Sequence, residues 1–209
     1  MYFMQYLTVV SVLLIALAGS AGCITTPATS PVPVVTQAPV IVPTTESKSV
    51  TVPASDFSLQ LSDLPADYII RDRSVMISPE VSQISRDLGW RQGYFVTFDR
   101  SGWIRNDQTR IHQAISIFAL EDMNKVFTLE KEELLHGGDP LTVPGEIPFP
   151  TAGDQSIACR MNDKPAAGQV TYTVIFTKKN AFEQITMTGT STDYEVLKDI
   201  VQKAAAKIR

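Results

Sequence analysis

The first apolar segment of the chain is an uncharged, mostly aliphatic block over residues 7–18, followed by small residues and by a cysteine at position 23. A run of this length is typical of the apolar core of an export signal. Further along the chain, apolar residues either alternate with polar ones or recur every three to four positions, as they do in strands and amphipathic helices. The pattern therefore predicts an export signal followed by a folded domain.

Alternation with the two-residue period of a β-strand marks the segments 93–99, 111–118, 155–161, 169–178 and 182–188. In the second of these, Ile111, Ile115 and Ile117 form the inward set, and polar Gln113 interrupts it. Residues 178–180, Lys-Lys-Asn, form a tight polar turn that predicts a hairpin between the last two strands. Sequential strands with short connections favour an antiparallel sheet.

Three amphipathic helices are predicted between and after these strands. The first begins at Ser78 as N-cap with Pro79 in the first helical position, and the third begins with a capping box from Thr192 to Glu195. The expected inward residues are Val81, Ile84 and Leu88 in the first helix, Met123, Val126, Phe127 and Leu134 in the second, and Leu197, Ile200, Val201, Ala204 and Ile208 in the third. Strands and helices without strict alternation place the domain in the α+β class, an antiparallel β-sheet packed with amphipathic helices.

The distribution of charge separates the N-terminal part from the rest of the chain. Residues 1–45 contain no charged side chain, whereas 18 basic and 22 acidic residues follow. Only the N-terminal stretch is long and uncharged enough to span a bilayer, which excludes a polytopic membrane protein. The net charge of −4, without any basic cluster, argues against nucleic acid as a partner.

The sequence Ser20-Ala21-Gly22-Cys23 resembles a lipobox, in which small residues precede a cysteine that is lipidated and becomes the new N-terminus. We therefore expect residues 1–22 to be a signal peptide of the lipoprotein type and Cys23 to carry the lipid. The alternative is an uncleaved anchor helix over residues 2–24, which has about the length that crosses ~30 Å of hydrocarbon. Both alternatives tether the chain to the extracytoplasmic face of a membrane.

Residues 23–54 are expected to form a linker and residues 55–209 one globular domain. The linker contains the prolines Pro27, Pro31, Pro33, Pro39, Pro43 and Pro53. Proline removes backbone donors, and a segment without aromatic residues does not build a core, so we expect a semi-rigid spacer. With Cys23 lipidated, Cys159 has no partner, so the stability of the domain must come from packing rather than from a disulfide.

The order of elements and short motifs suggests a family. The motifs are the lead segment 61–68, Gly89-Trp90 and Gly93-Tyr94 before a strand, Val126-Phe127 at the end of a strand-helix pair, and the turn 153–156 into a strand. Together with the long hairpin and the closing helix, they resemble the small secreted lipoproteins of methanogenic archaea and of actinobacteria, which are similar to the PsbP-like α/β/α sandwich. The resemblance implies a non-catalytic extracytoplasmic module, and no functional residue is transferred from it.

Known catalytic signatures are absent from the sequence, among them Gly-x-Ser-x-Gly, His-Glu-x-x-His, the Walker loop and the dinucleotide glycine motif. His112 is expected on the strand face opposite Ile111 and Ile115, as an ordinary surface or second-layer histidine. His136 precedes Gly137, and together they predict a helix stop in which a glycine adopts the left-handed conformation. We therefore predict no enzyme activity, no metal and no cofactor.

The loop over residues 141–156 is the most unusual part of the domain, because three prolines stiffen it and Phe149 is a large apolar residue in a region expected to be exposed. One hypothesis is a rigid recognition edge that presents Phe149 and Trp103 to a small ligand or an envelope protein. The alternative is that the loop folds back and buries Phe149 on the sheet. For the whole chain, the favoured hypothesis is a binding or accessory lipoprotein; a structural envelope component and an unrecognised hydrolase are the alternatives.

Overall fold

The computed structural model describes residues 52–101, 108–137, 144–163 and 168–209. The predicted signal peptide, Cys23 and most of the predicted linker lie outside these residues. The strands are β1 Tyr68–Met76, β2 Gln92–Ser101, β3 Gln108–Ile117, β4 Gly145–Ile147, β5 Gln155–Asp163, β6 Gln169–Lys178 and β7 Ala181–Gly189. The helices are α1 Gln83–Asp87, α2 Met123–His136 and α3 Tyr194–Lys207, with short 3-10 turns η1 Ala54–Phe57, η2 Leu61–Asp63, η3 Ser78–Glu80 and η4 Leu120–Asp122.

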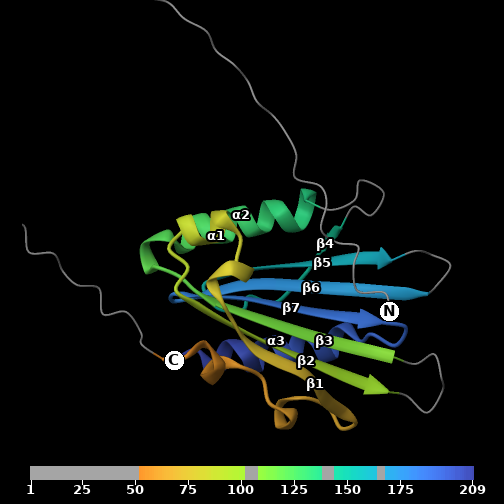
Figure 1. The fold of residues 1–209 in the computed structure, drawn as a ribbon. Coiled ribbons are helices and arrows are strands. Elements are labelled where there is room, and N and C mark those ends of the chain that lie inside the picture. Colours follow the sequence, from red (N-terminus) through yellow and green to blue (C-terminus); the bar gives the residue numbers. More distant parts are fainter. Residues whose placement is uncertain (1–51, 102–107, 138–143, 164–167) are drawn as a thin grey trace, which may run out of the picture. The chain divides into compact units, whose positions relative to one another are not determined.

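The strands form a seven-stranded sheet in the order β1-β2-β3-β7-β6-β5-β4, and every neighbouring pair is antiparallel (Figure 1). The predicted hairpin joins β6 to β7 through Lys179, whose φ is 55°. The strand β7 therefore pairs with β6 on one side and with β3 on the other, and it joins the two halves of the sheet. This architecture confirms the predicted α+β class.

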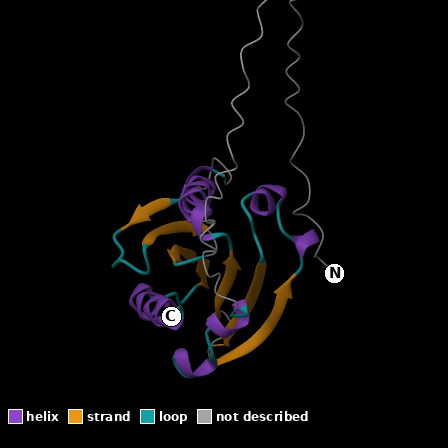
Figure 2. Ribbon diagram, turned by 90° about the vertical axis from the view of Figure 1, so that its left-hand side faces the viewer, coloured by secondary structure: helices purple, strands orange, loops and turns teal. Residues whose placement is uncertain are grey.

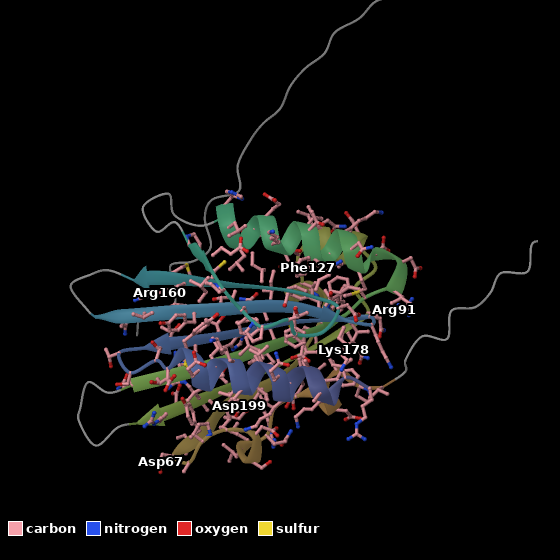
Figure 3. The ribbon with its side chains drawn as sticks, turned by 180° about the vertical axis from the view of Figure 1, so that it is seen from behind. Asp67, Arg91, Phe127, Arg160, Lys178 and Asp199 are labelled. Carbon is pink, nitrogen blue, oxygen red and sulfur yellow. The ribbon has the colours of Figure 1, made fainter. Side chains whose placement is uncertain are left out.

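One face of the sheet is covered by α3 and by the N-terminal turns η1 and η2, and Figure 3 looks onto this face. The helix buries an apolar stripe made by Leu197, Ile200, Val201 and Ala204, none of which is exposed to solvent. The stripe packs on inward residues of the strands, namely Val96, Phe98, Ile111, Ile115, Val174, Phe176, Ile185 and Met187. Lys178 at the end of β6 donates a hydrogen bond of 2.7 Å to the carbonyl oxygen of Ala205 and holds the last turn of α3.

The other face of the sheet carries α2, and Figure 2 shows the two long helices on opposite sides of the curved sheet. Helix α2 lies over β5, β6 and β7, where Met123 and Val126 contact a second apolar cluster. The strands contribute Ile157, Cys159, Ile175 and Phe182 to the buried part of this cluster, and Phe118, which directly follows β3, completes it. Successive residues of β6 therefore pack on opposite sides, with Val174 and Phe176 in the cluster beneath α3 and Ile175 in the cluster beneath α2.

The two outermost strands have unusual features. The register of β1 against β2 shifts between Ile70 and Asp72, which marks a β-bulge at Arg71. Arg71, Asp72 and Arg73 are all exposed at this point. At the other edge, β4 has only three residues and is followed directly by Pro148.

Three local predictions were wrong. The predicted first helix is divided into η3 and α1, and α1 takes Ser82 as N-cap, whose hydroxyl accepts from the backbone N–H of Ser85 at 3.0 Å. In this short helix Ile84 points outward with 63% of its surface exposed, so it does not join the core. Helix α3 is capped by Asp193 rather than by Thr192, because the Asp193 carboxylate accepts from two backbone N–H groups of the first turn.

Candidate functional site

A polar pocket of about 270 Å³ lies at one end of the sheet, where β1, β2 and β3 come beside the end of β7. Three of its lining residues are arginines, Arg71, Arg100 and Arg110, and one is an acid, Asp99. Its remaining lining residues are Gln108, Thr109, Gln169, Thr188 and Gly189. Because nearly all of these residues belong to strands, the pocket has a floor of hydrogen-bonded backbone rather than of loops. We refer to it as the arginine pocket.

Two of the three arginines of the arginine pocket, Arg71 and Arg110, are joined by the carboxylate of Asp99. Asp99 stands directly opposite Arg110 in the β2–β3 register and next to the bulge that carries Arg71. The Nε of Arg110 donates to Oδ1 of Asp99 at 2.8 Å, and its Nη2 donates to Oδ2 at 3.3 Å. Nη1 of Arg71 donates to Oδ2 at 2.7 Å. The hydrogen bond from Arg110, with that from Arg71, holds the pKa of the Asp99 carboxyl below its usual range. Asp99 is therefore a carboxylate that holds two guanidinium groups side by side.

A row of threonines continues from the arginine pocket across the sheet face that α2 only partly covers. The Thr171 and Thr188 hydroxyls lie 2.9 Å apart, and those of Thr173 and Thr186 lie 3.2 Å apart. Such cross-strand hydroxyl pairs satisfy each other without using a charged group. The face beside the pocket is thus polar but locally satisfied.

His112 lies in this row on the face opposite Ile111 and Ile115, as predicted, and it is half-buried. Its Nδ1 is 2.9 Å from Oγ1 of Thr97, and its ring lies 5.8 Å from that of Phe95. Burial, followed by the positive charge of Arg110, lowers the pKa of His112 below 6.5. The histidine is therefore electrostatically coupled to the arginine pocket.

A second polar pair lies within the core on the α3 side. Gln113 and Glu183 have no exposed surface, and Nε2 of Gln113 donates to Oε2 of Glu183 at 2.7 Å. Oε1 of Gln113 accepts from the backbone N–H of Leu59 at 2.8 Å, which ties the N-terminal segment to the sheet. Burial raises the pKa of Glu183 to about 8, so the carboxyl is protonated at neutral pH. Because the pair is enclosed by apolar residues and lines none of the pockets described here, we assign it to the architecture rather than to a binding site.

Phe149, a predicted site residue, is half-buried and packs against the core on the α3 side. Its ring lies 6.3 Å from that of Tyr194, whose hydroxyl donates to the carbonyl oxygen of Pro148 at 2.6 Å. Phe149 also lines a shallow pocket of about 410 Å³ between β4 and β5. The other predicted site residue, Trp103, lies outside the described residues, so the structure does not bring the two together.

The remaining candidates have local roles. His136 is in the last turn of α2 with its Nδ1 3.1 Å from a carboxylate oxygen of Glu132, and Gly137 has φ of −79°, so the predicted left-handed glycine is not at this position. Trp90 packs against the cluster beneath α2. Cys159 is a free, buried thiol whose pKa is raised by burial.

Over the described ranges, no group of three or more His, Cys, Asp or Glu side chains is arranged to hold a metal ion. Within the same ranges, no helix has the length and hydrophobicity needed to cross a membrane.

Sequence reasoning missed the arginine pocket, although one signal was available. Asp99 and Arg110 are equally spaced from the centre of the connection between the second and third strands, so a hairpin there places them opposite each other. The position of Arg71 carried no such signal, because β1 was not predicted.

Comparison with known proteins gives a fold and no family. Neither a protein-family model nor a curated protein sequence matches the chain. Among solved structures, the extracellular domain of PknH from Mycobacterium tuberculosis is similar, with a TM-score of 0.53 and 8% sequence identity. The alignment covers 74% of this chain and 94% of that domain. At this identity the likeness shows a shared fold, and the predicted resemblance to PsbP-like lipoproteins stays a prediction.

Proposed function

We infer that the chain is an extracytoplasmic lipoprotein, held at the membrane through Cys23, whose domain is a non-catalytic binding module. The observation that carries this inference is the likeness of almost the whole described domain to an extracellular domain. The export-type N-terminal sequence supports the same location independently. The arginine pocket is the binding site that we assign to the module, because rigid strands position its polar side chains.

The location is tested by intact mass and by lipid labelling of the membrane-extracted protein. We expect a mass that lacks residues 1–22 and includes a lipid on Cys23. The Cys23→Ala variant is expected to lose the lipid label, and Cys159→Ala, which removes the buried thiol, is expected to keep it. A mass that includes residues 1–22 would instead support the uncleaved anchor helix.

The binding function is tested by thermal stabilisation of the full chain with a panel of neutral, cationic and anionic small molecules. Gln169 is exposed at the pocket, so Gln169→Trp is expected to obstruct it and to abolish stabilisation by a ligand. Gln83→Trp, on exposed α1, serves as the matched control and is expected to retain it. Recovery of the ligand unchanged supports a binding module, whereas release of a product would favour the hydrolase alternative.

A further inference from the structure

The arginine pocket contains more positive charge than its own acid can balance. Asp99 is the single acid among its described lining residues, and it is bonded by two arginines, Arg71 and Arg110. One guanidinium would suffice to pair the Asp99 carboxylate, since a bidentate arginine already satisfies both carboxylate oxygens. The second arginine on Asp99 therefore needs another explanation than the pairing of this carboxylate.

The geometry leaves guanidinium donors free. Within the described part of the chain, Asp99 is the hydrogen-bond partner of both the Arg71 and the Arg110 side chains, through Nη1 of the former and through Nε and Nη2 of the latter. A guanidinium has five N–H donors, so each arginine keeps donors that Asp99 does not use. The side chains of Arg71 and Arg110 are 58% and 51% exposed, so these donors are accessible to a solute.

Asp99 also fixes the spacing of the two cations. The guanidinium groups of Arg71 and Arg110 repel each other, and the carboxylate that both of them bond holds them together before any ligand binds. Oxyanions such as phosphate and carboxylate match the planar, forked donors of arginine. Gln108 and Gln169 add neutral hydrogen-bonding groups to the lining, suited to hydroxyl groups of the same ligand.

We propose that the arginine pocket binds a small soluble molecule through a phosphate or carboxylate group, which the guanidinium groups of Arg71 and Arg110 contact from the side away from Asp99. The volume of about 270 Å³ limits the ligand to the size of a small metabolite. This inference rests on the proposed binding function and specifies its ligand class.

The test uses the full chain in phosphatidylcholine nanodiscs, titrated calorimetrically with inorganic phosphate, with succinate and with uncharged glucose. We expect phosphate or succinate to bind, glucose not to bind, and the affinity to fall as salt is added, because the arginines are partly exposed. Arg110→Ala and Arg71→Ala are each expected to weaken binding by about tenfold or more. Arg110→Lys keeps the charge without the fork and is expected to give an intermediate affinity.

Arg73→Ala is the matched control, since it removes the same charge from the same exposed strand. Arg73 pairs with Val96 on the α3 side of the sheet and does not line the pocket. We expect this variant to bind as the wild type does. Circular dichroism of each variant verifies that a loss of binding does not come from unfolding.

His112 gives a second readout that a purely structural ion pair would not change. An anion beside Arg110 offsets the positive charge that lowers the pKa of His112, so this pKa is expected to rise on binding, as measured by NMR titration.

A lipid headgroup is tested as a source of the phosphate by adding phosphatidylglycerol to the nanodiscs. Weaker binding of soluble phosphate at constant ionic strength would show that headgroups compete for the pocket and would overturn the assignment to a soluble ligand.

Absence of binding by both oxyanions up to about 10 mM would overturn the inference, as would equal losses in Arg110→Ala and Arg73→Ala. These outcomes are distinguishable from failure of the proposed function. If a neutral molecule binds and Gln169→Trp abolishes its binding, the binding module is supported while the oxyanion inference fails.

Discussion

Gln113 on β3 donates a hydrogen bond of 2.7 Å to Glu183 on β7, and neither side chain reaches solvent. Oε1 of Glu183 has no hydrogen-bond partner among the described residues. A carboxylate in this position would carry an uncompensated charge inside an apolar core, so the neutral acid is the stable form. The pair links β3, to which Leu59 of the N-terminal segment is hydrogen-bonded, with β7, which joins the two halves of the sheet.

This burial predicts a pH dependence of stability. The folded protein keeps a proton on Glu183 up to a pKa of about 8, while an ordinary glutamate releases it near 4.5. The contribution of the neutral Glu183 carboxyl to the free energy of unfolding is therefore fully present below pH 4.5. It decreases as the pH rises toward 8, by about 1.4 kcal/mol per pH unit at most. Glu183→Gln should flatten this slope in urea unfolding between pH 5 and 8. Glu121→Gln, at an exposed position, should keep it, and equal slopes in wild type and Glu183→Gln would contradict the prediction.

The N-cap of α3 gives a second prediction. Asp193 Oδ1 accepts from the backbone N–H groups of Glu195 and Val196 at 2.9 and 3.3 Å. Asp193→Ala should lower the free energy of unfolding by about 1 kcal/mol, because it leaves these donors without their cap. Thr192→Ala should cost less than about 0.5 kcal/mol. The reverse order in urea titrations would assign the cap to Thr192.

Gly153 and Gly168 have the same φ of 63°, so alanine substitutions at the two positions distinguish backbone strain from a steric clash. A Cβ on Gly153 would collide with the carbonyl oxygen of Thr177, whereas a Cβ on Gly168 would meet nothing within 4 Å. Gly168→Ala should therefore cost about 1–2 kcal/mol, from the left-handed backbone alone. Gly153→Ala should cost on the order of 3 kcal/mol or more, because the turn into β5 must also move. Similar melting temperatures for the two variants would contradict this explanation.

Phe149 gives a prediction that separates packing from recognition. Its half-buried ring contacts α3 through Tyr194, so Phe149→Ala should cost about 2–3 kcal/mol in the free energy of unfolding. Tyr194→Phe keeps the ring and removes only the hydrogen bond to Pro148, and it should cost about 1 kcal/mol. If Phe149→Ala melts like the wild type and loses binding of a ligand, Phe149 belongs to a recognition edge.

The elements that the sequence predicted correctly are those in which one residue face is buried along the whole element. The strands β2, β3, β6 and β7 alternate cleanly because each has neighbours on both sides and a helix or turn above at least one face. In β1, by contrast, the bulge at Arg71 breaks the alternation, and most of the strand is exposed at the edge of the sheet. Ile84 followed a helical period, but α1 is too short to bring this position to the core.

The arginine pocket needed information that periodicity does not contain. Arg71 and Asp99 are separated by 28 positions, and they meet only because β1 is the edge strand beside β2 and is shifted by its bulge. Gln113 illustrates the same limit, since a polar residue in an apolar stripe does not identify its partner. The partner, Glu183, is 70 positions away on β7, and the sequence does not predict that β7 pairs with β3.

The two edge strands have a consequence for molecules crowded on one surface. An open strand edge favours pairing with the same strand of another copy, and the proposed membrane anchor would raise the frequency of such encounters. The bulge and the consecutive charges of Arg71, Asp72 and Arg73 disfavour a continuous ladder at β1, and the brevity of β4 followed by Pro148 does so at the other end. These features disfavour edge-to-edge polymerisation of the sheet, so copies anchored densely as proposed would not aggregate through their sheets.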